Sequence, residues 1–141
     1  KGLETLHLRA NAQSDNALAV GRFLEGRVPK ILHPGLPSHP QYDLAQRQMS
    51  KCGAVFSFEL DGGRKAAHGF LDALELIDIS NHFGDTKTLL CHNASTTHSS
   101  LSEETRLAMG VSQGMVRISV GLEDPEDLIA DLDQALAKVG L

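Results

Sequence analysis

Two kinds of apolar periodicity alternate along this chain, and they constrain its fold more than any other feature. Residues 54, 56, 58 and 60 are apolar and alternate with a second set of side chains, which is typical of a strand with one buried face. Residues 64–76 place apolar side chains three and four apart, which predicts a helix. Strand and helix patterns follow each other to the C-terminus, so the sequence predicts an α/β fold.

The N-terminal third carries a second strong helical pattern. A long amphipathic helix is expected to end near residue 26, with one apolar face formed by Leu3, Leu6, Ala10, Ala17, Val20 and Leu24. Segment 33–40 contains three prolines and cannot be regular structure, whereas 42–49 is expected to be a short helix. Short strands are expected over 28–32, 76–79 and 88–91.

Capping residues predict two helices near the C-terminus. Ser102 precedes two acids and is expected to cap a helix that stops at Gly110. Asp124 is followed by Pro125 at the first helical position, which predicts the start of the last helix. The segment between these helices, around Arg117, reads as an apolar strand.

Composition excludes several classes of partner. A net charge of -5 without a basic run argues against nucleic acid and anionic membranes, and no apolar run reaches the ~20 residues of a membrane span. The 141 residues fit one domain with a real core. Cys52 and Cys91 lie far apart without CxxC spacing, which favours buried thiols in a reducing compartment. Because the chain opens at Lys1 directly in a helical pattern, we expect it to be a piece of a longer polypeptide.

Neither metal nor nucleophile chemistry has a clear signal. The spacing of His82, His92 and His98 does not match a set of metal ligands, so no metal site is predicted. Ser95 lies in a hydroxyl-rich stretch, but the chain has no GxSxG elbow, Walker loop or GxGxxG. A metal- or serine-dependent hydrolase would need bound metal or reactivity toward a serine probe.

Arg117 is the one residue that suggests a ligand. A guanidinium on an apolar strand needs an anionic partner, because burying it unpaired costs several kcal/mol. Its planar fork matches a carboxylate in a bidentate manner. The partner is either an acid of the fold or the carboxylate of a ligand, and the residue alone favours a structural ion pair.

Several motifs in order resemble one enzyme family. Gly-Asp-Thr-Lys-Thr-Leu at 84–89, His-Asn-Ala-Ser-Thr-Thr-His at 92–98 and Val-Arg-Ile-Ser-Val-Gly-Leu-Glu-Asp at 116–124 resemble the C-terminal domain of the Cys/Met-metabolism enzymes that use pyridoxal phosphate. Segments 1–6 and 33–50 resemble it too. The resemblance implies the C-terminal domain of a fold-type I transferase, with a small, mostly antiparallel sheet and helices packed on it. Residues 1–25 would be a long helix at the domain junction, and 26–141 the α/β domain.

Within this family the chain is most similar to the sulfhydrylases that make homocysteine from O-succinylhomoserine in methionine biosynthesis. Segments 36–41, 79–81 and 95–98 carry that similarity. Methionine gamma-lyase follows closely, because segment 98–100 and the Arg117 strand look equally like it, and cystathionine synthases and lyases belong to the same transsulfuration family. The alternative from a different class is a non-enzymatic binding domain that has kept the fold.

The resemblance also implies roles for individual residues. Arg117 would bind the α-carboxylate of the amino-acid substrate. His82 stands where relatives place Ser or Asn beside the same carboxylate, and Thr97 matches a threonine at the mouth of the active site. Asn93 stands where relatives usually have proline, which would loosen its loop.

The resemblance assigns no catalytic, cofactor-binding or metal-binding residue to this chain. Lys51, Lys65 and Lys87 match none of the family's cofactor motifs. Pyridoxal phosphate would be held by a larger upstream domain that this chain lacks, so the chain alone is expected to be inactive. The implied partners are the amino-acid substrate, the chain's own N-terminal cofactor domain and further copies in a homotetramer, and the implied location is cytoplasmic.

Overall fold

A five-stranded sheet lies at the centre of the computed structural model, which describes residues 1–141. Its strands are β1 (Lys30–Leu32), β2 (Val55–Glu59), β3 (Asp78–Ile79), β4 (Leu89–His92) and β5 (Met115–Ser119), in the spatial order β1-β2-β5-β4-β3. The β1–β2, β2–β5 and β4–β5 pairs are antiparallel, whereas β3 pairs with β4 in parallel. The expected small, mostly antiparallel sheet is confirmed.

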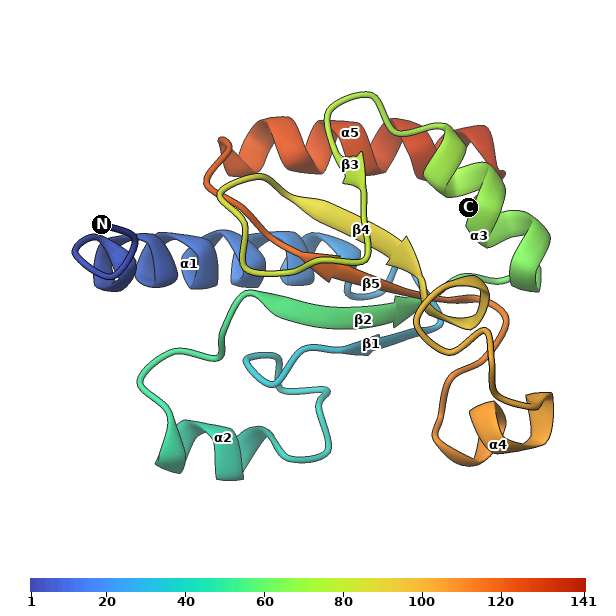
Figure 1. The fold of residues 1–141 in the computed structure, drawn as a ribbon, viewed down its shortest axis with the longest axis horizontal. Helices are drawn as coiled ribbons and strands as arrows, with labels where there is room; N and C mark the ends of the chain where they lie inside the picture. Colours follow the sequence, from blue (N-terminus) through green and yellow to red (C-terminus); the bar gives the residue numbers. More distant parts are fainter.

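The larger helices cover one face of this sheet (Figure 1). They are α1 (Leu6–Leu24), α3 (Gly63–Asp72) and α5 (Pro125–Lys138). The shorter α2 (Tyr42–Gln48), the 3-10 turn η1 (Asn93–Ser95) and α4 (Glu103–Ala108) lie outside that layer. Phe58 on β2 and Phe70 on α3 meet edge to face in the core, with ring centroids 5.9 Å apart.

Alternation along β5 separates core residues from candidate functional residues. Val116 and Ile118 are fully buried and belong to the core beneath the helices. Arg117 and Ser119 therefore face the opposite side of the sheet, because successive strand side chains point to opposite faces. Ser57 on β2 and Cys91 on β4 lie directly opposite Arg117 in the strand register, so their side chains face the same side.

The apolar stripe of α1 is buried only in its C-terminal half. Ala17, Val20 and Leu24 are completely buried in the core. By contrast, Leu3 is 84% exposed, and Leu6 and Ala10 are exposed too, so the N-terminal part of the predicted apolar face is not buried in this structure. The N-terminal half of α1 extends past the end of the sheet in Figure 1, where no strand lies beneath it.

The helix expected over 64–76 ends four residues early, at Asp72. The cause is Asp131 on α5, whose carboxylate accepts hydrogen bonds from the backbone N–H groups of Glu75, Leu76 and Ile77 at 2.8, 2.9 and 2.9 Å. These bonds redirect the chain away from helical geometry, and the following strand begins only at Asp78. Burial opposes ionisation of Asp131, but the donated hydrogen bonds keep its pKa below the ordinary value.

Local capping chemistry predicts two helix starts correctly. Ser102 Oγ accepts from the Thr105 N–H at 3.2 Å, and an Asp124 carboxylate oxygen accepts from the Glu126 N–H at 2.9 Å. Pro125 is the first residue of α5. Each cap satisfies an N–H group that the helix itself cannot pair.

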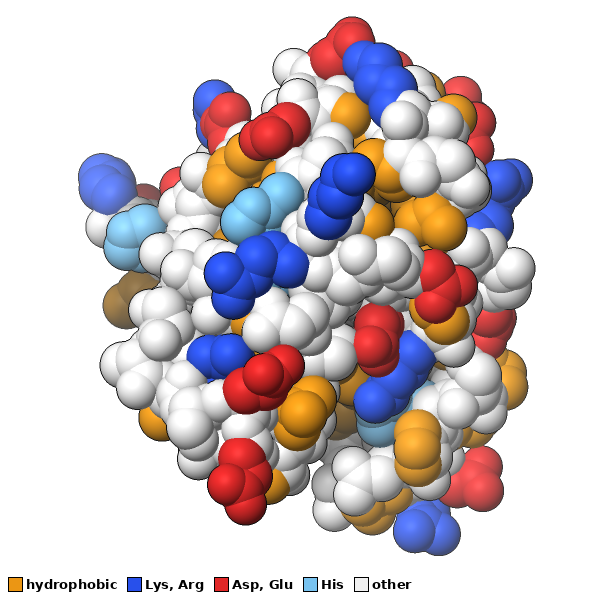
Figure 2. All heavy atoms as spheres, turned by 90° about the vertical axis from the view of Figure 1, so that its right-hand side faces the viewer, with side chains coloured by type: hydrophobic (Ala, Val, Ile, Leu, Met, Phe, Trp, Pro, Cys, Tyr) orange, Lys and Arg blue, Asp and Glu red, His pale blue; other side chains and the backbone are white.

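The surface shows no segregation of charge on the side that carries α3 and α4. Figure 2 shows acidic, basic and apolar side chains interspersed over that side. None of the helices is both long enough and apolar enough to span a membrane.

Candidate functional site

Arg117 reaches from β5 to the loop that follows β3. Its Nη2 donates to the carbonyl oxygen of Asn81 at 2.7 Å and lies 3.3 Å from that of His82. The guanidinium carbon also lies 5.6 Å from the centroid of the Phe83 ring, within the range of a cation–π contact. The cation is therefore held by backbone carbonyls and an aromatic face.

No carboxylate of this chain pairs with Arg117. The ion pairs of the structure involve other residues, so a structural ion pair, which the residue type alone favoured, is not present. Its Nε and Nη1 groups have no acceptor within the chain. A guanidinium carries five N–H donors in a planar fork, so these free N–H groups can donate hydrogen bonds to the carboxylate of a ligand.

The loop that surrounds Arg117 is fixed from both ends. The Gly84 N–H donates to Ser119 Oγ at 2.9 Å, and Gly84 has φ +77°, a conformation that glycine adopts without strain. At the other end, the Thr88 N–H donates to Glu123 at 2.6 Å. Two side chains of β5, Arg117 and Ser119, thus hold one loop over the open face of the sheet.

His82 and Thr97, the other two expected substrate-binding residues, are more exposed than Arg117. The backbone of His82 contacts Arg117, but its ring is exposed and forms no hydrogen bond within the chain. Thr97 is exposed beyond η1, and its hydroxyl lies 2.8 Å from His98 Nδ1. The structure therefore brings Arg117 and His82 together and forms no hydrogen bond between Thr97 and either of them.

Asn93 closes the turn that carries Thr97. Its carbonyl oxygen accepts from the backbone N–H groups of Thr96 and His98 at 3.3 and 3.0 Å. Its side-chain oxygen lies 3.8 Å from the Cys91 thiol. Burial raises the pKa of that thiol, although the nearby Arg117 charge acts in the opposite direction.

A cluster that sequence reasoning missed lies beside this turn. Ser95 Oγ is 2.7 Å from His92 Nδ1 and 3.1 Å from Nε2 of His68 on α3. His92 Nε2 is 2.9 Å from the Gln113 carbonyl, which can only accept, so that nitrogen carries the proton. Burial, reinforced by neighbouring cations, lowers the pKa of His92 and keeps its imidazole neutral.

The cluster ties η1 to α3 and to the turn before β5. His68 and His92 are 24 residues apart and follow no motif spacing, so only the tertiary fold brings them together. Ser95 next to a neutral imidazole is similar to the hydroxyl–base pair of hydrolases, but Ser95 here also binds His68. No group of three His, Cys, Asp or Glu residues is arranged to hold a metal ion.

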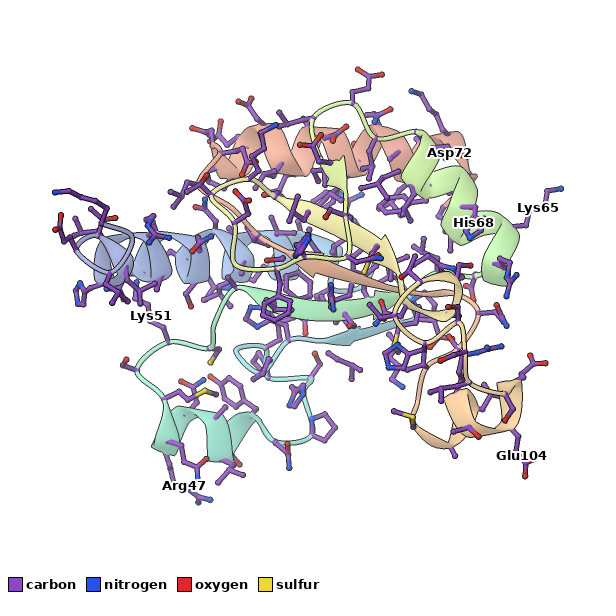
Figure 3. The ribbon with its side chains drawn as sticks, in the orientation of Figure 1. Arg47, Lys51, Lys65, His68, Asp72 and Glu104 are labelled. Carbon is purple, nitrogen blue, oxygen red and sulfur yellow. The ribbon has the colours of Figure 1, made fainter.

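Lys51, Lys65 and Lys87 do not fit the aldehyde of pyridoxal phosphate. A lysine that forms a Schiff base must lose its proton, which burial and neighbouring cations favour. Lys51 instead pairs with Asp15, and Lys65 projects outward from α3 (Figure 3). Lys87 hydrogen-bonds Asp78 at 2.9 Å, which raises its pKa.

Comparison with known proteins gives one consistent result. Residues 1–137 match the family described as Cys/Met metabolism PLP-dependent enzyme. The chain is 48% identical to the O-succinylhomoserine sulfhydrylase of Pseudomonas aeruginosa, over 97% of this chain and 34% of that protein. It is 50% identical to the sulfhydrylase of the same name from Mycobacterium tuberculosis, over 97% of this chain and 35% of that protein.

Other activities are represented among the relatives. An L-methionine gamma-lyase of Fusobacterium nucleatum is 44% identical over 99% of this chain and 36% of its own length. The cystathionine gamma synthase of Xanthomonas oryzae pv. oryzae, solved in complex with aminoacrylate and cysteine, superposes with a TM-score of 0.93. That match has 39% identity and covers 98% of this chain and 36% of that one.

These matches confirm the expected fold class, that of a fold-type I pyridoxal-phosphate enzyme. The chain spans about a third of the length of the curated relatives it matches. Within that third, the family match and the identities to named relatives agree. The chain therefore belongs to the Cys/Met metabolism PLP-dependent enzymes.

Proposed function

We propose that this chain is the C-terminal, substrate-binding domain of a sulfhydrylase that converts O-succinylhomoserine and sulfide to homocysteine and succinate. The identities of 48% and 50% to two O-succinylhomoserine sulfhydrylases support this choice, because the gamma-lyases reach 43% to 46%. The observation that carries the proposal is Arg117, a half-buried cation with free donors and no acid of its own chain nearby.

Arg117 anchors the α-carboxylate of the amino acid. Its Nη2 is fixed by the carbonyl oxygens of the loop after β3, so the rest of the fork is oriented before the substrate arrives. Such preorganisation reduces the entropy lost on binding and fixes the orientation of the Cα–H bond. His82 supports the fork mainly through its carbonyl oxygen, and Thr97 lines the mouth of the same site.

The remaining parts of the enzyme lie outside this chain. Pyridoxal phosphate supplies the electron sink for the reaction and is held by a preceding domain, because Lys51, Lys65 and Lys87 do not fit it. Leu6 and Leu8 on the exposed N-terminal half of α1, with Leu3 in the turn before it, form the surface on which that domain packs. The complete enzyme is a cytoplasmic homotetramer in methionine biosynthesis, and the free thiols of Cys52 and Cys91 are compatible with that compartment.

The test is a substrate panel with the native-length gene product. The protein is purified with pyridoxal phosphate and mixed with O-succinylhomoserine and sulfide, and homocysteine is measured by chromatography. Formation of homocysteine that depends on both substrates is expected. O-acetylhomoserine is offered in parallel to identify the preferred acyl group.

Methionine gamma-lyase is the second candidate, supported by the 44% identity to the Fusobacterium enzyme. Release of methanethiol from methionine alone, without homocysteine from O-succinylhomoserine, would replace the sulfhydrylase with this activity. A protein that binds no cofactor and turns over neither substrate would be a binding domain instead.

A further inference from the structure

The loop that orients Arg117, residues 80–88 between β3 and β4, has little buried surface of its own. Every residue from Asn81 to Lys87 is exposed, so hydrophobic contacts contribute little to the position of this loop. Its backbone is placed by hydrogen bonds instead. The carbonyl oxygens of Asn81 and His82 therefore meet Arg117 only where those hydrogen bonds hold the loop.

One of these hydrogen bonds comes from α1. Gln13 Nε2 donates to the carbonyl oxygen of Asp85 at 2.5 Å. Because a carbonyl oxygen can only accept, the amide nitrogen of Gln13 faces the loop. Gln13 is 5% exposed, and burial of an amide is unfavourable unless the amide is hydrogen-bonded. The buried amide of Gln13 therefore has a specific partner, and that partner is the loop.

Asn16 adds a second connection, one turn further along α1. Its Nδ2 donates to the carbonyl oxygens of Gly121 and Glu123 at 3.2 and 2.9 Å. The carboxylate of Glu123 in turn accepts from the N–H and the hydroxyl of Thr88 at 2.6 and 2.8 Å. The helix α1 thus holds the loop directly through Gln13 and indirectly through the turn after β5.

The proposed function gives this connection to α1 a purpose. The exposed N-terminal half of α1 is the part on which the cofactor domain is proposed to pack. Because α1 is one continuous helix, a loop bonded to Gln13 keeps a fixed position relative to Leu6, about two turns earlier. A substrate carboxylate must be held at a fixed position relative to the cofactor, since small displacements of a reacting group slow the reaction strongly.

We propose that Gln13 is a positioning residue for the substrate carboxylate, because it places the loop whose carbonyl oxygens orient the guanidinium of Arg117. This inference rests on the proposed role of Arg117. Without the Gln13 donor, the exposed carbonyl of Asp85 bonds to water and the loop is free to move away from α1. Arg117 then keeps its charge but loses part of its fixed orientation, so substrate binding weakens without being abolished.

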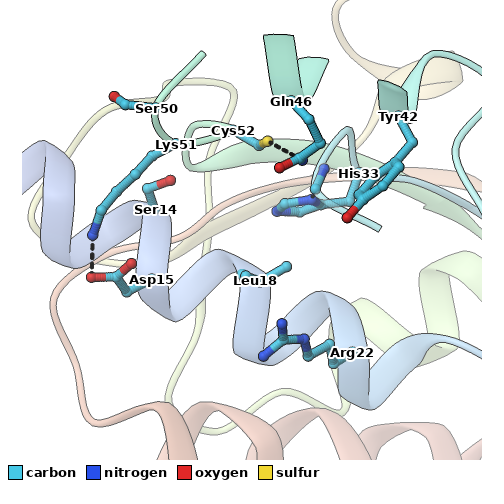
Figure 4. Close-up of a pocket in the computed structure, with 11 residues that line it drawn as sticks. Ser14, Asp15, Leu18, Arg22, His33, Tyr42, Gln46, Ser50, Lys51 and Cys52 are labelled. Atoms are coloured by element: carbon cyan, nitrogen blue, oxygen red, sulfur yellow. Dashed lines mark hydrogen bonds and ion pairs between the residues drawn. The ribbon is translucent and has the colours of Figure 1, made fainter. Parts of the chain in front are cut away.

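The neighbouring Ser14 supplies a matched control for Gln13. Gln13→Met removes the donor but keeps a side chain of similar length and helix propensity. Ser14 is also 5% exposed, and its Oγ accepts from the Gly53 N–H at 3.1 Å. Ser14 lines a cavity of about 270 Å³ between α1 and α2 (Figure 4) and forms no hydrogen bond with loop 80–88. Ser14→Ala therefore removes a buried hydrogen bond of the same helix without touching the loop.

The first measurement is steady-state kinetics of the native-length protein with O-succinylhomoserine and sulfide. Gln13→Met should raise the KM for the amino acid about 5- to 10-fold, the value of a single hydrogen bond. The KM for sulfide, which has no carboxylate, should stay unchanged, and Ser14→Ala should change neither KM. Gln13→His keeps an N–H donor and should recover part of the loss. In an Arg117→Ala background, Gln13→Met should have no further effect, because both residues act through the same contact.

The second measurement is amide hydrogen exchange of the same proteins, which does not depend on turnover. Gln13→Met should accelerate exchange severalfold over residues 81–88, whereas Ser14→Ala should accelerate it only around Gly53. Equal kinetic effects of the two variants, or additive effects of Gln13→Met and Arg117→Ala, would overturn the inference and leave the sulfhydrylase assignment intact. If no substrate is turned over, the proposed function fails by itself, and unchanged loop exchange in Gln13→Met would overturn the positioning role separately.

Discussion

The two faces of the sheet use the same strands for opposite purposes. Beneath α1, α3 and α5, alternate residues such as Phe58, Val116 and Ile118 are fully buried and belong to the hydrophobic core. On the other face, Arg117 is surrounded by backbone carbonyls and an exposed phenylalanine. A shift of one residue along β5 therefore separates a group that stabilises the fold from a group that can bind a ligand.

This difference shows where each kind of residue should be sensitive to mutation. Core side chains contribute to the free energy of unfolding through buried area, with little influence on ligand chemistry. Arg117 contributes little apolar burial and has unpaired donors, so its contribution should appear in binding. Substitutions in the core should therefore change stability most, and substitutions of Arg117 should change kinetics most.

The sharpest contrast is between two phenylalanines on opposite faces. Phe58 is completely buried, and Phe58→Ala should lower the free energy of unfolding by about 3–5 kcal/mol. Phe83 is 69% exposed, and Phe83→Ala should cost no more than about 1 kcal/mol, the value of its contact with Arg117. Urea unfolding of both variants of the native-length protein measures the difference. If both variants lost the same free energy of unfolding, Phe83 would have to be packed against another part of the native-length protein.

Asp131 tests the buried polar link between the helices. Asp131→Asn should lower the free energy of unfolding by about 2–3 kcal/mol, because an amide cannot accept all the hydrogen bonds that the carboxylate receives from segment 75–77. Asp133→Asn, two residues along α5, loses only a surface ion pair with Arg27 and should cost about 0–1 kcal/mol. A loss for Asp133→Asn as large as that for Asp131→Asn would contradict this account.

The capped and periodic parts of this fold are predictable from local sequence, and Asp131 shows why other parts are not. Ser102 and Asp124 act on N–H groups two or three residues away, so the sequence alone identifies both helix starts. The end of α3 depends on a carboxylate more than 50 residues later in the chain. Burial of Leu3 and Leu6 depends on what packs against α1, which a periodic pattern cannot specify.

The candidate site shows the same division. Arg117 stands out in the sequence as a lone cation in an apolar strand, and its place on the open face follows from alternation. The cluster of His68, His92 and Ser95 has no sequence signal, because its members come from separate elements. The role of the His82 carbonyl was also hidden, since any residue supplies that group.

Buried imidazoles predict a smaller, pH-dependent loss of stability. The folded-state pKa values of His33 and His92 lie below the ordinary 6.5, mainly because burial disfavours the charged form. Their contribution is therefore complete above pH 6.5 and is lost as the pH falls through the lowered values. The urea concentration at the unfolding midpoint should decrease as the pH is lowered from about 7.5 to about 5.5. His92→Gln should make this decrease smaller. Replacement of the exposed His7 by Asn should leave it unchanged, and a flat wild-type profile would be inconsistent with neutral buried rings.

The smallest effect is expected at the N-cap of α4. Ser102→Ala should destabilise this short helix by about 0.5–1 kcal/mol, because the Thr105 N–H loses its acceptor. Amide hydrogen exchange should accelerate over residues 103–109. Ser100→Ala is the matched control, because the exposed Ser100 caps no helix, and unchanged exchange in Ser102→Ala would show that the cap contributes nothing.

The central claim is that Arg117 holds the carboxylate of the amino-acid substrate, and steady-state kinetics of the native-length protein test it most directly. Arg117→Ala should lower kcat/KM for the amino acid by about 100- to 1,000-fold, or about 3–4 kcal/mol, with KM rising strongly. Arg117→Lys should recover only part of this loss, because lysine lacks the planar fork. Arg47→Ala should behave as wild type. An Arg117→Ala protein with unchanged kcat and KM would contradict the account.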